Sequence, residues 1–419
     1  MRFHAPPGFA PYVASAREID HHHTKIFLAS RAGRSSCTFG DVVSLPRHAR
    51  YLAPLVAVVV AAACAASDSV GAFTPVSDDT ETGGAAGAVG ARDGGARDAT
   101  LASADAGALW PDAAPDAAVD AGPSPAFDAG PPPAFTCGGK AGPSGTRTLV
   151  VQSGGIVRTT ILHVPASLDP TKGAMLVLNF HGFSSANWQQ ELLTHMTQAA
   201  DERGFIVAYP EGVASSWNAG DCCGTSWVDA IDDVAFTRDL LDAIQADHCV
   251  DPARVFATGM SNGGFFSHRL ACDLSDRIAA ISPVSGVLGV DPGACNPKRH
   301  VPILHFHGTA DPIVPYGGGA PIVPQLGVGV DFVSVAASME AWRAKNQCAV
   351  TPTTFFQHGD ATCVEWEHCT DGATTALCTI DGGGHTWPGG LPIPAGKTSS
   401  DIDATAAMLQ FFDAHPMKK

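Results

Sequence analysis

Residues 255–264 read Val-Phe-Ala-Thr-Gly-Met-Ser-Asn-Gly-Gly. The apolar, partly β-branched beginning is typical of a central parallel strand, and two glycines then flank Ser261 in the pattern G-x-S-x-G. A serine on a sharp strand-to-helix turn needs small neighbours two residues away on either side, because the strand and the helix pass close to it. Gly259 and Gly263 meet this need. The stretch predicts a turn that exposes the Ser261 hydroxyl, although a glycine-rich loop with an ordinary serine would show the same letters.

Strand-like and helix-like segments alternate on both sides of this turn. Apolar runs typical of buried strands cover residues 174–180, 205–209, 255–258, 278–284, 301–306 and 375–381. Segments with helical periodicity cover residues 187–203, 232–248, 262–274, 331–346 and 401–415. Residues 147–164 contain two more strand-like runs around Ser153-Gly154-Gly155, which is a hairpin signal. The alternation predicts an α/β fold with a mostly parallel, doubly wound sheet and helices on both faces.

Two further polar residues follow predicted strands at the same edge of this sheet. Asp311 comes after strand 301–306, and His385 comes after strand 375–381. Ser261, Asp311 and His385 thus stand in the nucleophile–acid–base order of α/β-hydrolases. A histidine can take the proton of a serine hydroxyl, and an aspartate can fix the tautomer of that histidine. The alternatives are that Asp311 only caps a turn and that His385, like His305 or His307, is a structural histidine.

An oxyanion hole would need two N–H groups aimed at the developing charge. We expect one from Asn262, which follows the nucleophile, and the other from the loop after strand 174–180, at Phe183 or, as the alternative, Ser184. Trp217, Trp387 and Phe183 are candidates for a substrate pocket, and ordinary packing explains each of them equally well.

Charge and cysteine content limit the class of protein. The 419-residue chain has a formal net charge of -16, which argues against a nucleic-acid partner. Ten of the 12 cysteines lie between Cys137 and Cys378, and an even number in one region suggests disulfides in an exported domain. We expect Cys272 to pair with Cys295, and Cys348, Cys363, Cys369 and Cys378 to pair among themselves. No C-x-x-C pair is present, so we expect neither a metal nor another cofactor.

The N-terminal third has a different character. We interpret residues 1–64 as an extension with an export signal, because a basic flank precedes about a dozen apolar residues that end in Ala61-Ala62-Ala63-Cys64. This ending resembles a bacterial lipoprotein cleavage box, so a membrane tether through lipidated Cys64 and plain secretion are both open. Residues 65–136 are rich in Ala, Gly, Pro and Asp and predict a disordered linker. Residues 137–419 then form the catalytic domain, in an extracellular or cell-envelope location.

Five motifs together resemble one family, the secreted esterases known as polyhydroxybutyrate depolymerases, which includes feruloyl and acetyl xylan esterases. They are HGF at 181–183, WNAGDCCG at 217–224, VFATGMSNGG at 255–264, LHFHGTADPIVPY at 304–316 and IDGGGHTWPGG at 380–390. The resemblance spans residues 137–415 and implies an α/β-hydrolase fold and a metal-free serine esterase with Ser261, Asp311 and His385 as its triad. Polymer depolymerases commonly carry a binding module after the catalytic domain. This sequence ends soon after its last predicted helix, which favours soluble or oligomeric esters.

The sequence thus predicts an exported carboxylic ester hydrolase that works through an acyl-enzyme. Its substrate would be a polyester oligomer, a plant cell-wall ester or a small ester. An α/β-hydrolase peptidase is the first alternative, although such enzymes usually carry a large gating domain. A catalytically silent binding protein on the same scaffold is the second, and it would be expected to lack a triad member.

Overall fold

The computed structural model describes residues 124–127, 135–137, 139–320 and 331–418. The predicted export segment with Cys64 and most of the predicted linker over residues 65–136 lie outside this part of the chain. Within it, no helix is both long and apolar enough to cross a membrane.

One sheet of ten strands organises the described residues. Its strands, in chain order, are β1 Gly145–Ser153, β2 Ile156–Val164, β3 Ala174–Phe180, β4 Ile206–Pro210, β5 Val250–Met260, β6 Ala280–Val284, β7 Ile303–Gly308, β8 Thr353–His358, β9 Ala361–Trp366 and β10 Thr375–Ile380. The spatial order is β1-β2-β4-β3-β5-β6-β7-β10-β9-β8. In this spatial order, the strands that stand from β4 to β10 pair in parallel with their neighbours. The outer pairs at both edges are antiparallel.

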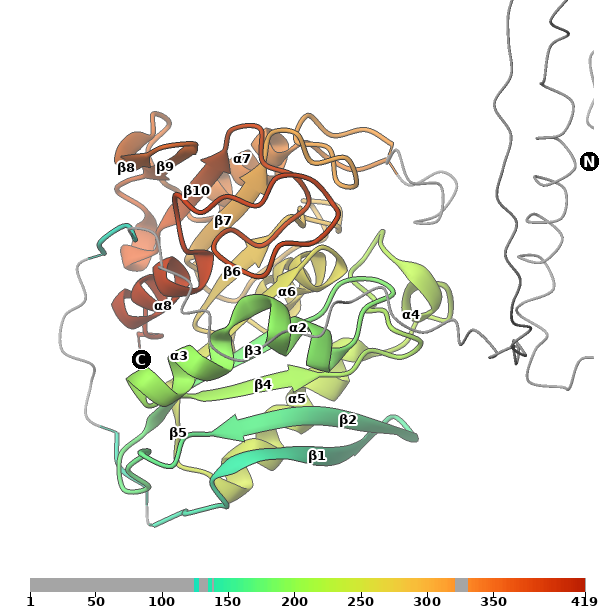
Figure 1. Cartoon of the computed structure of the whole chain (residues 1–419), viewed down its shortest axis with the longest axis vertical. Coiled ribbons are helices and arrows are strands. Elements are labelled where there is room, and N and C mark those ends of the chain that lie inside the picture. Colours follow the sequence, from blue (N-terminus) through green and yellow to red (C-terminus); the bar gives the residue numbers. More distant parts are fainter. Residues whose placement is uncertain (1–123, 128–134, 138, 321–330, 419) are drawn as a thin grey trace, which may run out of the picture. The chain divides into compact units, whose positions relative to one another are not determined.

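Helices cover both faces of the sheet (Figure 1). They are α2 Asn187–Thr194, α3 Met196–Arg203, α4 Gly224–Val228, α5 Asp233–Asp247, α6 Asn262–Asp273, α7 Val335–Lys345 and α8 Ala404–Ala414. Buried side chains of α5, α6 and α7 form one apolar core, and those of α2, α3 and α8 form a second core on the opposite face. Strands β3 and β5 contribute side chains to both cores, which is why residues 174–178 and 255–257 are apolar without interruption. The predicted α/β-hydrolase fold is confirmed.

The predicted helix over residues 187–203 is in fact two helices. His195 interrupts it with a backbone φ of 52° and ends α2 before α3 begins. The sequence carries no glycine or proline at this point, so helical periodicity predicts one continuous helix across the break. Leu192, in the last turn of α2, is 41% exposed.

Five disulfides link cysteines among the described residues. The expected Cys272–Cys295 pair is confirmed, as is pairing within the group of four, through Cys348–Cys369 and Cys363–Cys378. Two further pairs, for which the sequence suggested no partner, are Cys137–Cys249 and Cys222–Cys223.

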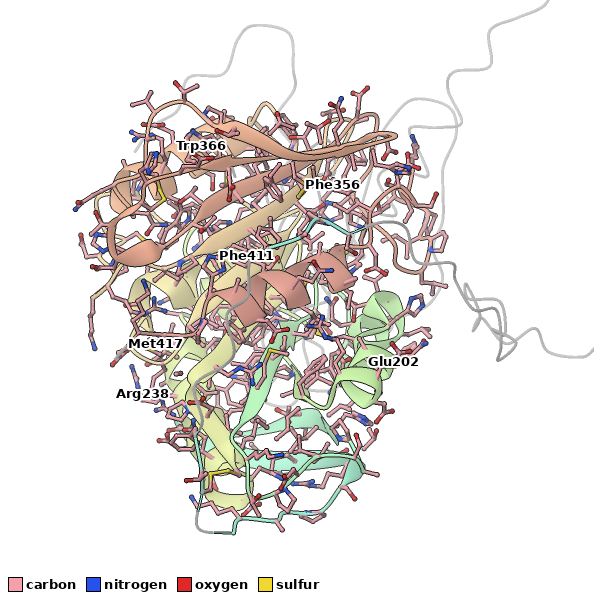
Figure 2. All side chains as sticks on the ribbon, turned by 90° about the vertical axis from the view of Figure 1, so that its left-hand side faces the viewer. Glu202, Arg238, Phe356, Trp366, Phe411 and Met417 are labelled. Atoms are coloured by element: carbon pink, nitrogen blue, oxygen red, sulfur yellow. A yellow bond between two sulfur atoms is a disulfide. The ribbon has the colours of Figure 1, made fainter. Side chains whose placement is uncertain are left out.

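A short segment of the predicted linker packs on the domain. Phe127 lies with its ring centroid 5.1 Å from that of Phe355 on β8 and 5.2 Å from that of Phe411 on α8. Figure 2 shows this segment running between the labelled Phe356 and Phe411. An aromatic residue in an otherwise Ala/Asp-rich stretch gains a contact that its small neighbours cannot make, so the folded unit includes residues before the expected boundary at 137.

Candidate active site

Ser261 occupies the turn between β5 and α6 that the sequence predicts. Its backbone φ of 55° and ψ of -123° belong to a region that a non-glycine residue rarely adopts. The Ser261 N–H donates to the carbonyl of Val284 on the neighbouring strand at 2.9 Å, and this bond helps to hold the turn. A Cβ on Gly259 would stand 2.5 Å from the carbonyl oxygen of Phe180, and one on Gly263 would stand 2.7 Å from that of His181. Both positions therefore require glycine because of close approach.

Asp311 and His385 are directly paired. The Nδ1 atom of His385 lies 2.8 Å from Oδ2 of Asp311, and both side chains are buried. The other oxygen of Asp311 accepts the N–H groups of Ile313 and Val314, each at 2.8 Å. Burial alone would raise the pKa of Asp311, but the hydrogen bond and charge of His385, with help from His307 and the Val314 N–H, hold it below its ordinary value. Asp311 is thus kept ionised beside His385.

A second line of histidines lies behind this pair. His307 donates from Nε2 to the Val314 carbonyl at 2.8 Å, and the same nitrogen is 3.5 Å from Oδ2 of Asp311. Since His307 Nδ1 must then accept, His305 Nε2, at 3.0 Å, donates to it. Burial lowers the pKa of both rings. These two histidines are structural, as the sequence suggested, and His307 adds support to the carboxylate.

Ser261 and His385 open into one pocket with a volume of about 250 Å³. The pocket is also lined by Gly182 and Phe183 from the loop after β3. Its remaining walls are mainly apolar. They come from α2, the end of β5, the loop after β7 and the loop after β10: Trp188, Leu192, Leu193, Met260, Ile313, Leu391 and Ile393. Sequence reasoning missed most of this wall. The one usable signal was an apolar residue such as Trp188 in the first turn of the helix directly after the HGF motif.

The two expected oxyanion donors come from two different segments, the start of α6 and the loop after β3. Asn262 is the first residue of α6, whose own hydrogen bonds begin with the Phe265 N–H donating to the Ser261 carbonyl. Phe183 lines the pocket. Of the two alternatives in its loop, Ser184 is unavailable because its N–H donates to the Ser215 carbonyl at 2.9 Å. Phe183 therefore remains the candidate.

The two candidate tryptophans do not line the pocket. Trp217 and Trp387 are each 0% exposed. Trp217 packs against Phe180 and Phe266, and Trp387 donates its indole N–H to Thr405 at 3.0 Å. The physical reason is that both indole rings extend the apolar cores that carry the site loops. Packing, the second of the two interpretations, describes them correctly.

Trp217 nevertheless supports the site through hydrogen bonds to two residues around it. The side-chain amide of Asn262 accepts the Trp217 N–H at 2.7 Å and donates to the Trp217 carbonyl at 3.0 Å. The Trp217 indole N–H donates to the His181 carbonyl at 3.0 Å. This residue joins the serine turn to the loop after β3.

No group of three or more His, Cys, Asp or Glu side chains within the described ranges is arranged to hold a metal ion. The chemistry available at the pocket is that of a serine hydroxyl, an imidazole, a carboxylate and backbone N–H groups.

Comparisons with known proteins point to one family. A family model described as Esterase PHB depolymerase matches residues 161–313, which include Ser261 and Asp311. NocK of Nocardia uniformis subsp. tsuyamanensis, whose name describes it as an esterase, is 30% identical over 280 residues, covering 61% of this chain and 79% of NocK. The chain belongs to the esterase PHB depolymerase family. The predicted resemblance to this family is confirmed.

Two other similar proteins were found. Feruloyl esterase B of Piromyces equi is 37% identical to this chain over 235 residues. The match covers 54% of the chain and 42% of the Piromyces protein. The chain thus spans less than half of that relative. Among solved structures, Thermogutta terrifontis esterase 2 phosphoramylated by tabun is similar with a TM-score of 0.43 and 17% identity, over 64% of this chain and 93% of that one.

Proposed function

We propose that the chain is a serine esterase in which Ser261, His385 and Asp311 act as nucleophile, base and acid. The observation that carries the proposal is the shared pocket: Ser261 and His385 both line it, while Asp311 binds His385 through Nδ1. That contact leaves Nε2 of His385 as the nitrogen able to take the serine proton.

The reaction follows from these roles. His385 removes the hydroxyl proton as Ser261 attacks the ester carbonyl, and the N–H groups of Phe183 and Asn262 stabilise the oxyanion. His385 then protonates the leaving alcohol, which gives an acyl-enzyme. Water, activated by the same imidazole, releases the acid and restores Ser261.

The pocket supports a statement about the substrate. Its walls are mainly apolar and its volume of about 250 Å³ lies below the range usual for drug-sized ligands. We propose a substrate whose acyl group is apolar and short or single-ringed, which fits ferulate-type and small aliphatic esters. The name of the Piromyces relative supports the first of these.

We also propose that the protein is exported. The support is the five disulfides among the described residues, because such a density is typical of oxidising compartments. Lipid anchoring through Cys64 stays a prediction of the sequence.

The test combines a substrate panel with one variant. Purified protein would be assayed with short nitrophenyl esters, methyl ferulate, acetylated xylan, polyhydroxybutyrate emulsion and a peptide anilide. We expect ester turnover that Ser261→Ala lowers by about 10³-fold or more, with an unchanged thermal midpoint. Full ester turnover in the variant would refute the role of Ser261. Preference for the anilide would favour a peptidase, and failure of a fluorophosphonate probe to label the wild type would favour a silent binding protein.

A further inference from the structure

His181 is a buried histidine whose side chain the proposed mechanism does not use. It follows β3 directly and precedes Gly182 and Phe183, which line the pocket. The ring contacts backbone groups on two sides: Nε2 lies 3.0 Å from the N–H nitrogen of Gly212, and Nδ1 lies 2.8 Å from the carbonyl oxygen of Gly182.

These two contacts determine the tautomer of His181. A backbone N–H can only donate, so Nε2 must carry the lone pair that accepts from Gly212. Nδ1 then carries the proton and donates to the Gly182 carbonyl. Burial, aided by the charge of Arg158 and opposed by the bond to Gly182, lowers the pKa of His181 to about 4, so the ring is neutral near pH 7.

The bond to Gly182 acts on the neighbouring peptide group. The Gly182 carbonyl and the Phe183 N–H belong to one planar trans peptide, in which they point in opposite directions. Fixing the carbonyl toward the His181 ring therefore fixes the N–H on the other side. The Ser185 N–H also donates to the Gly182 carbonyl, at 3.2 Å, and this bond closes a turn. The indole N–H of Trp217 donates to the carbonyl of the preceding residue, His181.

Ser261 lies next to Gly182. A Cβ placed on Gly182 would stand 3.4 Å from the Cβ of Ser261 and 4.0 Å from its Oγ. We propose that His181 is a positioning residue for the oxyanion hole: its Nδ1–H holds the Gly182 carbonyl so that the Phe183 N–H faces the oxyanion. This role rests on the proposed esterase function.

Two substitutions separate the contacts of the ring. In His181→Asn the amide nitrogen occupies the place of Nδ1 and can donate to Gly182, but the buried Gly212 N–H loses its acceptor. In His181→Gln the amide reaches the place of Nε2 and can accept from Gly212, but the donor to Gly182 is lost. His415→Gln is the matched control: burial also lowers the pKa of His415 to about 4, and its ring bonds to Phe411 and Thr374 at the end of α8.

The readouts are kcat and KM on a nitrophenyl ester, with the thermal midpoint measured in parallel. We expect His181→Gln to lower kcat by about 10- to 100-fold with little change in KM, less than the 10²- to 10³-fold typical of a deleted donor because the N–H is misaimed and not removed. His181→Asn should keep kcat within about fivefold of the wild type while lowering the thermal midpoint. His415→Gln should lower only the thermal midpoint.

Each outcome decides between positioning and structure. Equal loss of kcat in the asparagine and glutamine variants, loss in the control, or full kcat in His181→Gln would overturn the positioning role while leaving esterase function intact. If the glutamine variant does not fold, a loss above about 100-fold in His181→Asn would overturn the role. Absence of ester turnover in the wild type would overturn both proposals together.

Discussion

Replacing Gly263 with alanine tests the close packing of β3 against α6. The added Cβ would stand 2.6 Å from the carbonyl carbon of Phe180 and 2.7 Å from the carbonyl oxygen of His181, whereas ordinary contact begins near 3.4 Å. The Phe180 carbonyl oxygen would lie closer still, so the strand and the helix must separate by more than roughly 0.7 Å, and backbone atoms cannot rotate away as a side chain would. Overpacking of this kind costs about 1–3 kcal/mol.

Helix propensity acts in the opposite direction. Alanine is favoured over glycine by about 1 kcal/mol inside a helix, so propensity alone would make Gly263→Ala stabilising. Because the clash is with the backbone of Phe180 and His181, which cannot move aside as a side chain would, we expect it to outweigh helix propensity. The variant should lose about 1–2 kcal/mol of unfolding free energy. The same separation would carry Phe183 away from Ser261, and a misplacement approaching 1 Å lowers kcat by about 10- to 100-fold.

The assay pairs urea unfolding with steady-state hydrolysis of a nitrophenyl ester. Gly317→Ala is the matched control, because nothing lies within 4 Å of a Cβ at that position. We expect the control to be neutral or slightly stabilising with unchanged kcat. If Gly263→Ala were as stable and as active as the control, the steric account of the serine turn would be wrong.

Two further predictions concern charge. Asp311→Asn should lower kcat by about 10³- to 10⁴-fold with little change in KM, because the amide no longer selects the tautomer of His385; kinetics within tenfold of the wild type would contradict this. Burial lowers the pKa of His268 from 6.5 to about 3, so the stability tied to its neutral form is fully present above pH 6.5 and is lost as the pH falls toward 3. The loss of unfolding free energy between pH 6.5 and pH 5 should be about 2 kcal/mol. Urea unfolding of the wild type and of His268→Gln at both pH values measures it, and an equal loss in the variant would exclude His268 as the cause.

The parts of the site that could be read from the sequence are those fixed by sterics and chain direction. Gly259 and Gly263 are required by close approach, and Asp311 and His385 follow parallel strands whose ends meet at one edge. The sequence also allowed most strands, including the β1–β2 hairpin, to be placed within a few residues. These features depend on local pattern, which a single sequence contains.

What could not be read depends on tertiary contacts. The break at His195 comes without any breaker residue, and the tryptophans at 217 and 387 have the same local signals whether they line a pocket or fill a core. The backbone contacts of His181 join residues about 30 positions apart, and no periodicity records them. The identity of the pocket walls, and hence the acyl preference, became visible only with the fold.

The docking of Phe127 brings the two ends of the described chain together. Its ring centroid is 6.5 Å from that of His415, at the end of α8, and the Met417 N–H donates to the Ala253 carbonyl nearby. A shortened protein that begins near residue 124 would therefore have both of its termini in the same region. Immobilisation of such a protein through one terminus would crowd the other, so an engineered attachment would be better placed on an exposed loop elsewhere.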